Sequence, residues 1–418
     1  MSKEKRRVPK LRFPGFTEDW EQRKLGAMCS LFTDGDWIES KDQSNEGIRL
    51  IQTGNIGVGK FIDKPENKKW ISHSTFNNLR CKKLLDGDIL ISRLPQPAGR
   101  ACIVNTNNEK WITAVDCTIV RLLDQYSNKF ILQSLCTYSY FHLIDSFLAG
   151  GTRQRVSRSN LSDINIMSPE KIEQDKIGLF FECVDNLITL HQRKLDNLKL
   201  KKKALLQKLF PKNGERYPEL RFPGFTDAWE QRKLTDIAKT FIGLVTTMTE
   251  NYRDSGTLLI RNSDIKEGQF IFSEKPIHLD EEFAEKNKTR RLQIGDVVTV
   301  HTGDIGTSAV IQEKEAGAIG FATINTRTDK RILNPYFLST YFNTEKHKCY
   351  ANSVSTGDGR SNYNIKDFNK LVISIPTLDE QEKISVLINN INTIITLHQR
   401  KLDHLKLQKK ALLQQMFV

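Results

Sequence analysis

The sequence contains few of the features that mark secreted, membrane-bound or metal-binding proteins. None of its apolar runs approaches the roughly 20 residues that a membrane-spanning helix needs. The basic segment MSKEKRRVPK is not followed by the apolar stretch of a signal peptide. The seven cysteines among 418 residues are scattered, and no two of them form a CxxC pair. We therefore expect neither a disulfide framework nor a metal site, and we expect a cytoplasmic protein that does not associate with membranes.

Motifs of catalytic sites are absent or incomplete. There is no HExxH, no GxSxG and no Cys/His cluster. Residues 54–60 match GxxxxGK, but Phe61 stands where a phosphate-binding loop needs a Ser or Thr hydroxyl for magnesium. Residues 334–337, NPYF, lack one proline of the NPPY/F loop of adenine methyltransferases and are more typical of a helix start. The fragment ENK at residues 66–68, with Asp63 nearby, matches the ExK triplet of nuclease cores. It has no evident acidic partner on a neighbouring strand, which such a site would need. We predict that the chain catalyses no reaction by itself.

The sequence does contain an internal duplication, which is the first pattern to look for in a long chain. Residues 9–25, PKLRFPGFTEDWEQRKL, and residues 218–234, PELRFPGFTDAWEQRKL, are identical at 14 of 17 positions with an offset of 209. Residues 188–210, ITLHQRKLDNLKLKKKALLQKLF, and residues 395–417, ITLHQRKLDHLKLQKKALLQQMF, are identical at 19 of 23 positions with an offset of 207. The chain is therefore two copies of one unit.

Between these conserved ends, the two bodies differ in sequence but keep a common skeleton. GDIL at residues 87–90 corresponds to GDVV at residues 295–298, and EQDKI at residues 173–177 corresponds to EQEKI at residues 380–384. Repeats that agree at their ends and differ between them predict one scaffold that presents two different recognition surfaces. Neutral drift after duplication is the alternative, but drift is not expected to spare both ends of each repeat.

Each conserved tail predicts a helix of about 40 residues, or about 60 Å, because no Pro or Gly interrupts it after residue 178 or after residue 376. Steps of four and three residues mark one apolar seam on each helix, as in a coiled coil. The seam positions are Ile177, Phe181, Val184, Ile188, His191, Leu195, Leu198, Lys202, Leu205 and Leu209, and then Ile384, Ile388, Ile391, Ile395, His398, Leu402, Leu405, Lys409, Leu412 and Met416. We predict that the two helices pair as an antiparallel coiled coil and that the polar seam residues set its register.

The bodies predict mixed α/β structure, because short apolar runs alternate with Gly, Asp and Asn. The predicted fold class is α+β: two mixed α/β domains, each followed by a long helix, related as a pseudo-twofold duplication. We expect one helix in each body, at residues 129–148 and 335–351. Strands are predicted at residues 49–52, 88–92, 117–122, 258–261, 296–301, 308–312 and 321–325. The predicted boundaries are 1–168 and 213–375 for the domains and 169–212 and 376–418 for the helices.

Polar loops in the bodies are candidates for contact with nucleic acid. Arginine donates bidentately to guanine, Asn and Gln suit adenine, and hydroxyl groups hold phosphates. Such side chains gather after the GDIL and GDVV segments and in the loops GGTRQRVSRSN and TGDGRSNYN that precede the tails. For any single one of them, a solvated loop is as good an explanation. The candidate DNA-binding residues are Arg93, Gln96, Arg100, Arg153, Gln154, Arg155, Arg158, His301, Thr302, Arg360, Ser361, Asn362 and Tyr363.

In its RFPGF, GDIL/GDVV, EQxKI and LHQRKLD motifs, and in their order, the sequence resembles the specificity subunit of type I restriction–modification enzymes. The resemblance covers essentially the whole chain. It implies two target recognition domains that each read one half of a bipartite site in double-stranded DNA, with the paired helices as the spacer. It further implies two adenine methyltransferase subunits, which bring S-adenosylmethionine, and two restriction subunits, which bring ATP and magnesium. No cofactor is expected on this chain.

Two other functions are alternatives. A homo-oligomeric scaffold or adaptor would bind through its helices and have no role on DNA. A stand-alone restriction enzyme would carry its own methylase or nuclease, and it would need motifs that this sequence lacks.

The net charge of +13 is concentrated on the scaffold. Residues 188–210 carry +6, residues 395–417 carry +4 and residues 1–25 carry +4, which leaves about −1 for the rest of the chain. The basic helix faces are suited either to cover phosphates or to dock on acidic partner surfaces. The bodies that are expected to read bases are electrically balanced.

Overall fold

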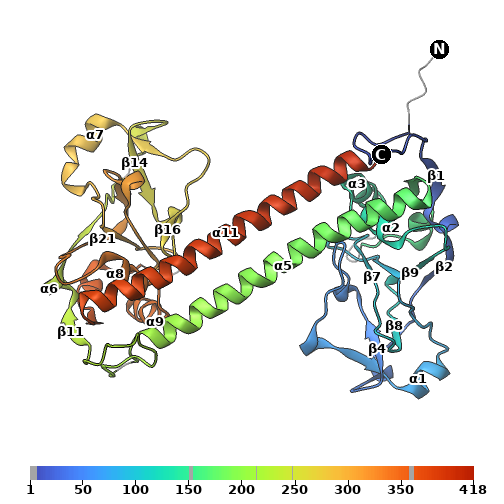
Figure 1. Ribbon diagram of the computed structural model, residues 1–418, viewed down its shortest axis with the longest axis horizontal. Coiled ribbons are helices and arrows are strands. Elements are labelled where there is room, and N and C mark those ends of the chain that lie inside the picture. Colours follow the sequence, from blue (N-terminus) through green and yellow to red (C-terminus); the bar gives the residue numbers. More distant parts are fainter. Residues whose placement is uncertain (1–6, 150–153, 213, 247, 357–361) are drawn as a thin grey trace, which may run out of the picture. The chain divides into compact units, whose positions relative to one another are not determined.

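The structure is a computed structural model that describes residues 7–149, 154–212, 214–246, 248–356 and 362–418. The chain divides into two compact units (Figure 1). The first unit comprises Met1–His191 and Lys401–Val418, and the second comprises Gln192–Arg400. This division differs from the predicted one, because each long helix contributes one half to each unit instead of forming a separate domain.

The first body contains two four-stranded sheets, with strand orders β2-β9-β6-β7 and β3-β5-β4-β8. The first of these sheets is antiparallel throughout, and in the second only β4 and β8 run parallel. The strands of this unit are β1 (Glu21–Lys24), β2 (Cys29–Asp34), β3 (Gln43–Ser44), β4 (Ile48–Ile51), β5 (Lys69–Ile71), β6 (Ile89–Ser92), β7 (Ala101–Ile103), β8 (Trp111–Thr113), β9 (Cys117–Leu122) and β10 (Asn165–Ser168). Its helices are α1 (His73–Asn78), α2 (Asn128–Ser134), α3 (Tyr138–Ser146) and α4 (Arg158–Ser162).

The second body repeats this topology, with strand orders β12-β21-β18-β19 and β13-β17-β14-β20 and an added β15-β16 hairpin. Its strands are β11 (Glu230–Lys233), β12 (Ala238–Ile242), β13 (Tyr252–Arg253), β14 (Thr257–Arg261), β15 (Ile265–Lys266), β16 (Gln269–Phe270), β17 (His278–Leu279), β18 (Val297–Val300), β19 (Ser308–Val310), β20 (Ile319–Phe321), β21 (Thr323–Thr328) and β22 (Val372–Ile375). Its helices are α6 (Leu234–Ile237), α7 (Glu281–Lys286), α8 (Pro335–Phe342), α9 (Glu345–Val354) and α10 (Ile365–Phe368). Identical strand order in two bodies of different sequence confirms the duplication at the level of the fold.

Most predicted strands are present, but the single helix predicted in each body is wrong. Each is two helices, α2 and α3 in the first body and α8 and α9 in the second. Thr137 and Thr344 each cap a new helix, with their side chains accepting from the amides of Tyr140 and His347. A threonine that caps a helix start competes with continuation of the preceding helix. The strand predicted at residues 321–325 is also interrupted, because Ala322 has a φ of 50° between β20 and β21.

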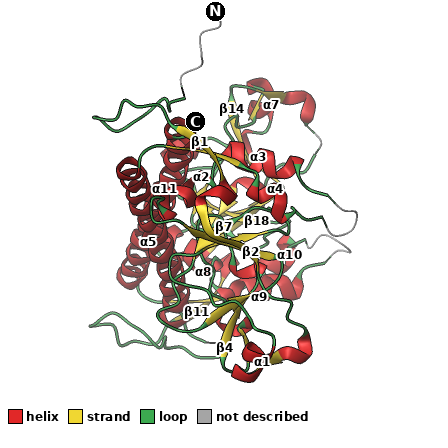
Figure 2. Cartoon of the chain, turned by 90° about the vertical axis from the view of Figure 1, so that its right-hand side faces the viewer, coloured by secondary structure: helices red, strands yellow, loops and turns green. Residues whose placement is uncertain are grey.

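The long helices begin and end close to the predicted boundaries, as α5 (Lys171–Leu209) and α11 (Leu378–Met416). All twenty predicted seam positions are buried or partly buried. In the first unit, Phe181 of α5 lies 6.0 Å from Phe417 beyond the end of α11, and Asp185 accepts from Lys409 Nζ at 2.6 Å. In the second unit, the last turns of α5 share a core with the first turns of α11. The helices run antiparallel within each unit (Figures 1 and 2), which confirms the predicted pairing.

The conserved lead-in of each repeat is joined to the start of its long helix by a bidentate ion pair. Arg12 donates to both oxygens of Glu173 at 2.7 and 2.8 Å, and Arg221 donates to both oxygens of Glu380 at 2.8 Å. The side chains of the two glutamates are 0% and 1% exposed. Beside these pairs, the ammonium groups of Lys176 and Lys383 lie over the rings of Phe16 and Phe225 at 4.8 and 4.7 Å. The RFPGF and EQxK motifs are therefore two sides of one contact.

The far end of each long helix packs against the tryptophan of the other repeat's lead-in. Trp20, 2% exposed, lies 6.2 Å from Phe417, and Trp229, 0% exposed, lies 5.8 Å from Phe210. The backbone amide of Leu11 donates to Gln415 O at 2.9 Å, and Leu220 donates to Lys208 O at the same distance. Each helix thus begins in the core of its own repeat and ends in the core of the other.

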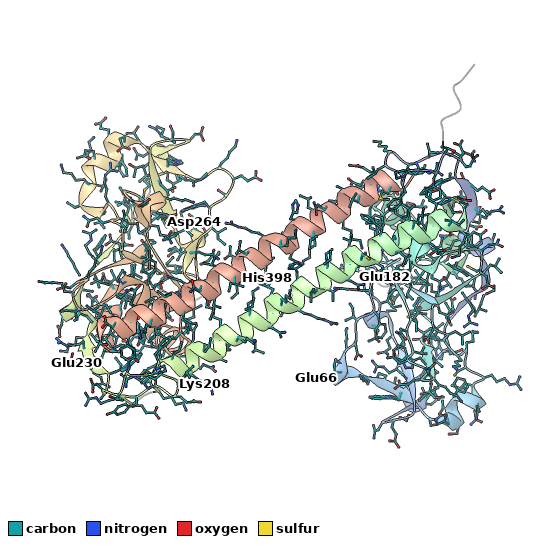
Figure 3. The ribbon with its side chains drawn as sticks, in the orientation of Figure 1. Glu66, Glu182, Lys208, Glu230, Asp264 and His398 are labelled. Carbon is teal, nitrogen blue, oxygen red and sulfur yellow. The ribbon has the colours of Figure 1, made fainter. Side chains whose placement is uncertain are left out.

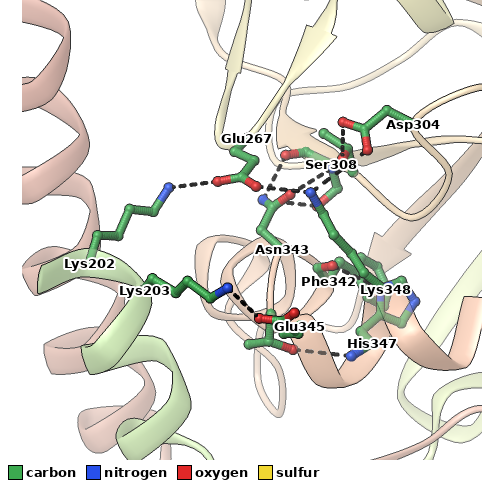
Figure 4. Close-up of polar contacts among 12 residues, drawn as sticks. Lys202, Lys203, Glu267, Asp304, Ser308, Phe342, Asn343, Glu345, His347 and Lys348 are labelled. Atoms are coloured by element: carbon green, nitrogen blue, oxygen red, sulfur yellow. Dashed lines mark hydrogen bonds and ion pairs between the residues drawn. The ribbon is translucent and has the colours of Figure 1, made fainter. Parts of the chain in front are cut away.

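Ion pairs fasten the helices to the bodies along their length. In the first unit, Glu182 of α5 accepts from Lys129 of α2 at 2.7 Å (Figure 3). In the second unit, Glu267 joins Lys202 of α5 at 3.1 Å to Lys348 of α9 at 2.9 Å (Figure 4). Burial opposes the ionisation of Glu267, but these two ammonium groups outweigh it and lower the pKa of the carboxyl. The two seam lysines therefore have different acidic partners, because Lys409 pairs with α5 and Lys202 pairs with the β15-β16 turn.

A buried histidine lies in the core of the second unit. His347 Nδ1 donates to the carbonyl of Phe342 at 2.8 Å, and the Tyr363 hydroxyl donates to His347 Nε2 at 3.3 Å. His347 and Tyr363 are both 0% exposed. Burial lowers the pKa of His347 to about 4, against the hydrogen bond to Phe342, so the ring is neutral in the folded protein at neutral pH.

In the part of the chain that the structure describes, no helix is both long and apolar enough to cross a lipid bilayer.

Replacing Arg12 by Met is expected to destabilise the first unit by about 3 kcal/mol, because it leaves the charge of Glu173 buried without its partner. Urea unfolding would measure the loss. Arg23→Met is the matched control, since the ion pair of Arg23 with Glu21 is exposed and worth little. The double variant Arg12→Met/Glu173→Leu is expected to recover most of the stability. Equal losses for Arg12→Met and Arg23→Met would contradict the role of the Arg12–Glu173 ion pair.

Acidification is expected to weaken the second unit through His347. The unfolded chain takes up a proton on this residue near its ordinary pKa of 6.5, whereas the folded protein does so only near 4. Stability is therefore complete above pH 6.5 and falls as the pH decreases between these values, by about 3 kcal/mol from this group. Calorimetric unfolding across this pH range should show a shallower decline for His347→Gln, which stays neutral. The same decline in both proteins would show that the histidine does not contribute.

Candidate nucleic-acid interface

In both bodies the same pattern of backbone hydrogen bonds holds the polar loops, and we call this pattern the frame. In the first, the amide of Val156 donates to the carbonyl of Arg93, directly after β6, at 3.0 Å. In the second, the amide of Tyr363 donates to the carbonyl of His301, directly after β18, at 2.9 Å. The residues just before these amides, Arg155 and Asn362, each form a backbone bridge across their own loop. The frame therefore places Arg93 and His301 at equivalent positions, and likewise Arg155 and Asn362.

In the first unit this frame carries a group of charged side chains, which we call the arginine–aspartate cluster: Asp34, Arg93, Asp116, Arg155 and Arg158. Asp34 accepts from Thr118 Oγ1 at 2.9 Å and from Arg93 at 3.1 Å. Arg158 approaches Asp34 at 3.8 Å, and Arg155 approaches Asp116 at 3.6 Å. The cluster combines three arginines with two carboxylates and so has a net charge of +1.

Arg100, a predicted DNA contact, is directed at the backbone instead. Its guanidinium donates to the carbonyls of Ile56, Leu94, Pro97 and Thr53 at 2.6 to 3.0 Å. Burial lowers the pKa of this guanidinium. Arg100 thereby fixes the loop that follows β6, on which Gln96 is exposed.

In the second unit the same frame carries neutral groups. The Thr302 hydroxyl donates to Asn362 Oδ1 at 2.8 Å, so His301 Nδ1, also 2.8 Å from this hydroxyl, is the donor to it. The neutral His301 ring then leaves Nε2 as an acceptor. Burial lowers the pKa of His301, which favours this neutral form. The amide of His301 donates to Asn262 Oδ1 at 2.9 Å, which holds the end of β18 in place.

The structure separates the predicted contact residues into several groups. It brings Arg93, Arg155 and Arg158 together, and it also brings His301, Thr302 and Asn362 together. Tyr363 does not fit a base contact, because its side chain is fully buried in the core of the second unit. Gln96 and Gln154 are exposed and take no part in either group. Arg153, Arg360 and Ser361 lie outside the described residues.

Sequence reasoning missed the acidic residues of the interface. Asp34 and Asp116 were not candidates, although each lies next to a turn or strand end in the sequence. Asn262 was also missed. The signal that could have identified these residues is a polar residue at the end of an apolar strand. Among strand ends, the candidates named from the sequence follow only the two strands that contain the GDIL and GDVV motifs.

The ENK and NPYF fragments have identifiable places in the fold. Glu66 lies in an exposed turn at the edge of the first body (Figure 3), and Asn334 caps α8 through the amides of Tyr336 and Phe337. Within the described ranges, no three His, Cys, Asp or Glu side chains are grouped as metal ligands would be.

Comparison with known proteins gives a consistent result. The model of the type I restriction modification DNA specificity domain (Methylase_S) matches residues 17–200 and 226–407. The MjaVIII type I restriction enzyme specificity subunit of Methanocaldococcus jannaschii is 22% identical over 313 residues, which is 71% of this chain and 71% of the relative. The putative MjaX specificity subunit of the same organism is 20% identical over 417 residues, which is 95% of this chain and 92% of the relative.

Two solved structures share the fold. The S subunit of a type I restriction–modification system from M. genitalium has a TM-score of 0.62 at 14% identity and covers 98% of this chain and 99% of its own. A chain from a structure of type I restriction–modification complex assembly has a TM-score of 0.52 at 17% identity and covers 97% and 98%. The family model covers most of the chain in two matches, one for each repeat. The chain belongs to the type I restriction modification DNA specificity domain family and serves in the recognition of DNA sequence.

Proposed function

We propose that each unit reads one half of a bipartite DNA site and that partner subunits methylate adenine or cleave DNA according to this reading. The observation that carries the proposal is the common frame after β6 and β18, which holds different side chains in the two units. Arg155 occupies the frame in the first unit, beside the buried Arg93, and Asn362 occupies it in the second, beside His301. Equal backbones with unequal hydrogen-bonding groups suit two different half-sites.

In this proposal the chain itself is not catalytic. S-adenosylmethionine belongs to the methyltransferase subunits, and ATP and magnesium belong to the restriction subunits. The incomplete phosphate-binding loop at residues 54–61 supports this division, because Phe61 offers no hydroxyl to a magnesium ion. The complex works on cytoplasmic DNA.

The stoichiometry of two methyltransferase and two restriction subunits is supported by a surface that occurs twice. Both long helices expose apolar side chains at positions that are related by the offset of the repeat. These exposed pairs are Leu179 and Val386, Leu187 and Ile394, Leu190 and Leu397, and Leu200 and Leu407. Each unit contains one residue of every pair, so two copies of the same partner have equivalent docking surfaces.

Deleting the gene from its host is expected to remove methylation from one bipartite motif, because the methyltransferase then has no subunit that selects its sites. Single-molecule sequencing of the methylome with and without the gene would measure this. Restoring the gene on a plasmid is the control. If a functional methyltransferase is present and no methylated motif disappears, the proposal is wrong.

Shortening both long helices by one heptad, residues 192–198 and 399–405, is expected to shorten the unread spacer of the motif and leave both half-sites unchanged. One heptad is about 10 Å of helix, or about three base pairs, and its removal preserves the phase of the seam. Methylome mapping of this variant would report the spacer. A four-residue deletion in each helix is the control, because it breaks the seam and should abolish methylation. An unchanged spacer in the heptad variant would refute the role of the helices.

A further inference from the structure

The arginine–aspartate cluster has one buried member that is unsuited to contact DNA. Arg93 is only 9% exposed and lies between two carboxylates, 3.1 Å from Asp34 and 3.7 Å from Asp116. Arg155 and Arg158 are about half exposed, at 48% and 50%. Arg93 is therefore a positioning residue that holds the two aspartates, and the exposed arginines are the groups that an incoming ligand meets first.

Arg155 and Asp116 are close together but form no hydrogen bond with each other. Their closest atoms, Arg155 Nη1 and Asp116 Oδ1, are 3.6 Å apart, which is an ion pair but too long for a hydrogen bond. Asp116 Oδ1 is buried and has no hydrogen-bond partner. The Asp116 side chain as a whole is 26% exposed, so part of it is open to solvent although Oδ1 is not. A donor fork and a carboxylate acceptor thus stand side by side at the surface.

We infer that Arg155 and Asp116 together read one G·C base pair in the major groove, a reading that rests on the proposed function. Guanine presents N7 and O6 as two acceptors for two parallel N–H groups of the arginine guanidinium, which we call the fork. Cytosine presents its N4 amino group as a donor to the aspartate. Guanine O6 and cytosine N4 are hydrogen-bonded to each other, so they are about 2.9 Å apart. The Arg155 guanidinium and the Asp116 carboxylate are paired, with 3.6 Å between their closest atoms, so the two groups are near enough to face the two bases of a single pair.

An A·T pair fits this arrangement less well. Adenine places a donor, its N6 amino group, where guanine has O6, and this group opposes the second N–H of the arginine fork. Discrimination between the two pairs follows from the fixed spacing of the fork, which a lysine does not have.

The second unit lacks this pair of groups at the equivalent positions. The register of β6 with β9 places Asp116 one residue before the partner of Ser92, and the register of β18 with β21 places Ala322 one residue before the partner of Val300. The frame places Asn362 where the first unit has Arg155. The inference therefore concerns one half-site only, and the other half-site is read by neutral groups.

The test uses the complete system, with Arg155→Lys and Asp116→Asn introduced into the full-length chain. The motif of the wild type is first mapped by methylome sequencing, and methylation rates are then measured on DNA in which each base pair of the motif is replaced in turn. Arg155→Lys keeps the charge and loses the fork, and Asp116→Asn keeps the shape and adds a donor. Both variants are expected to lower the preference for the same single G·C pair by about tenfold or more, with the other half-site unchanged. Arg23→Gln, which removes the exposed pair with Glu21, is the control and should change nothing.

The outcomes separate this inference from the proposed function. If the wild-type gene directs methylation to no motif, the proposed function itself fails. If the motif exists but neither half-site contains a G·C pair, or if the two variants relax different base pairs or none, only the reading by Arg155 and Asp116 is overturned. Thermal unfolding of each variant identifies a folding defect, and Arg155→Lys, whose side chain is exposed, provides the reading if Asp116→Asn does not fold.

Discussion

The bidentate pair between the lead-in arginine and the first-turn glutamate determines how each repeat is built. It ties Arg12 to Glu173 and Arg221 to Glu380 with both guanidinium arms engaged, so the start of each long helix has a fixed direction relative to its body. The strand that follows each lead-in then pairs with the strand that precedes the same helix, β1 with β10 and β11 with β22. Because removing one partner would leave the charge of the buried glutamate uncompensated, both residues of this contact are present in each repeat although the bodies differ.

A fixed helix start leaves the far side of each body free to change. The loops after β6 and β18 keep their backbone hydrogen bonds to the segments before α4 and α10, and only the side chains on this frame differ. In the first unit the frame carries paired charges with a net charge of +1, and in the second it carries a chain of hydrogen bonds among neutral groups. Recognition is thus separated from assembly, which agrees with the small net charge of the bodies.

Local patterns in the sequence predicted the fold better than the site. The seam of each helix follows from its own heptads, so its positions could be identified without any knowledge of the bodies. The breaks at Thr137 and Thr344 were missed because a single threonine signals a helix start only weakly. The function of Arg100 was not visible, because its four carbonyl partners come from separate turns of the chain. Asp116 was missed for the same reason, since only the fold brings it beside Arg155.

The two hydrogen bonds of Leu11 with Gln415 and of Leu220 with Lys208 are alike in length and in place. Leu220 follows Lys208 by only 12 residues, whereas Leu11 and Gln415 are 404 residues apart in the sequence. The same hydrogen bond therefore forms whether its two partners are near or far apart in the sequence, so it does not depend on a short connection between them. Each unit thus receives the end of a long helix through an equivalent backbone hydrogen bond and an equivalent tryptophan contact.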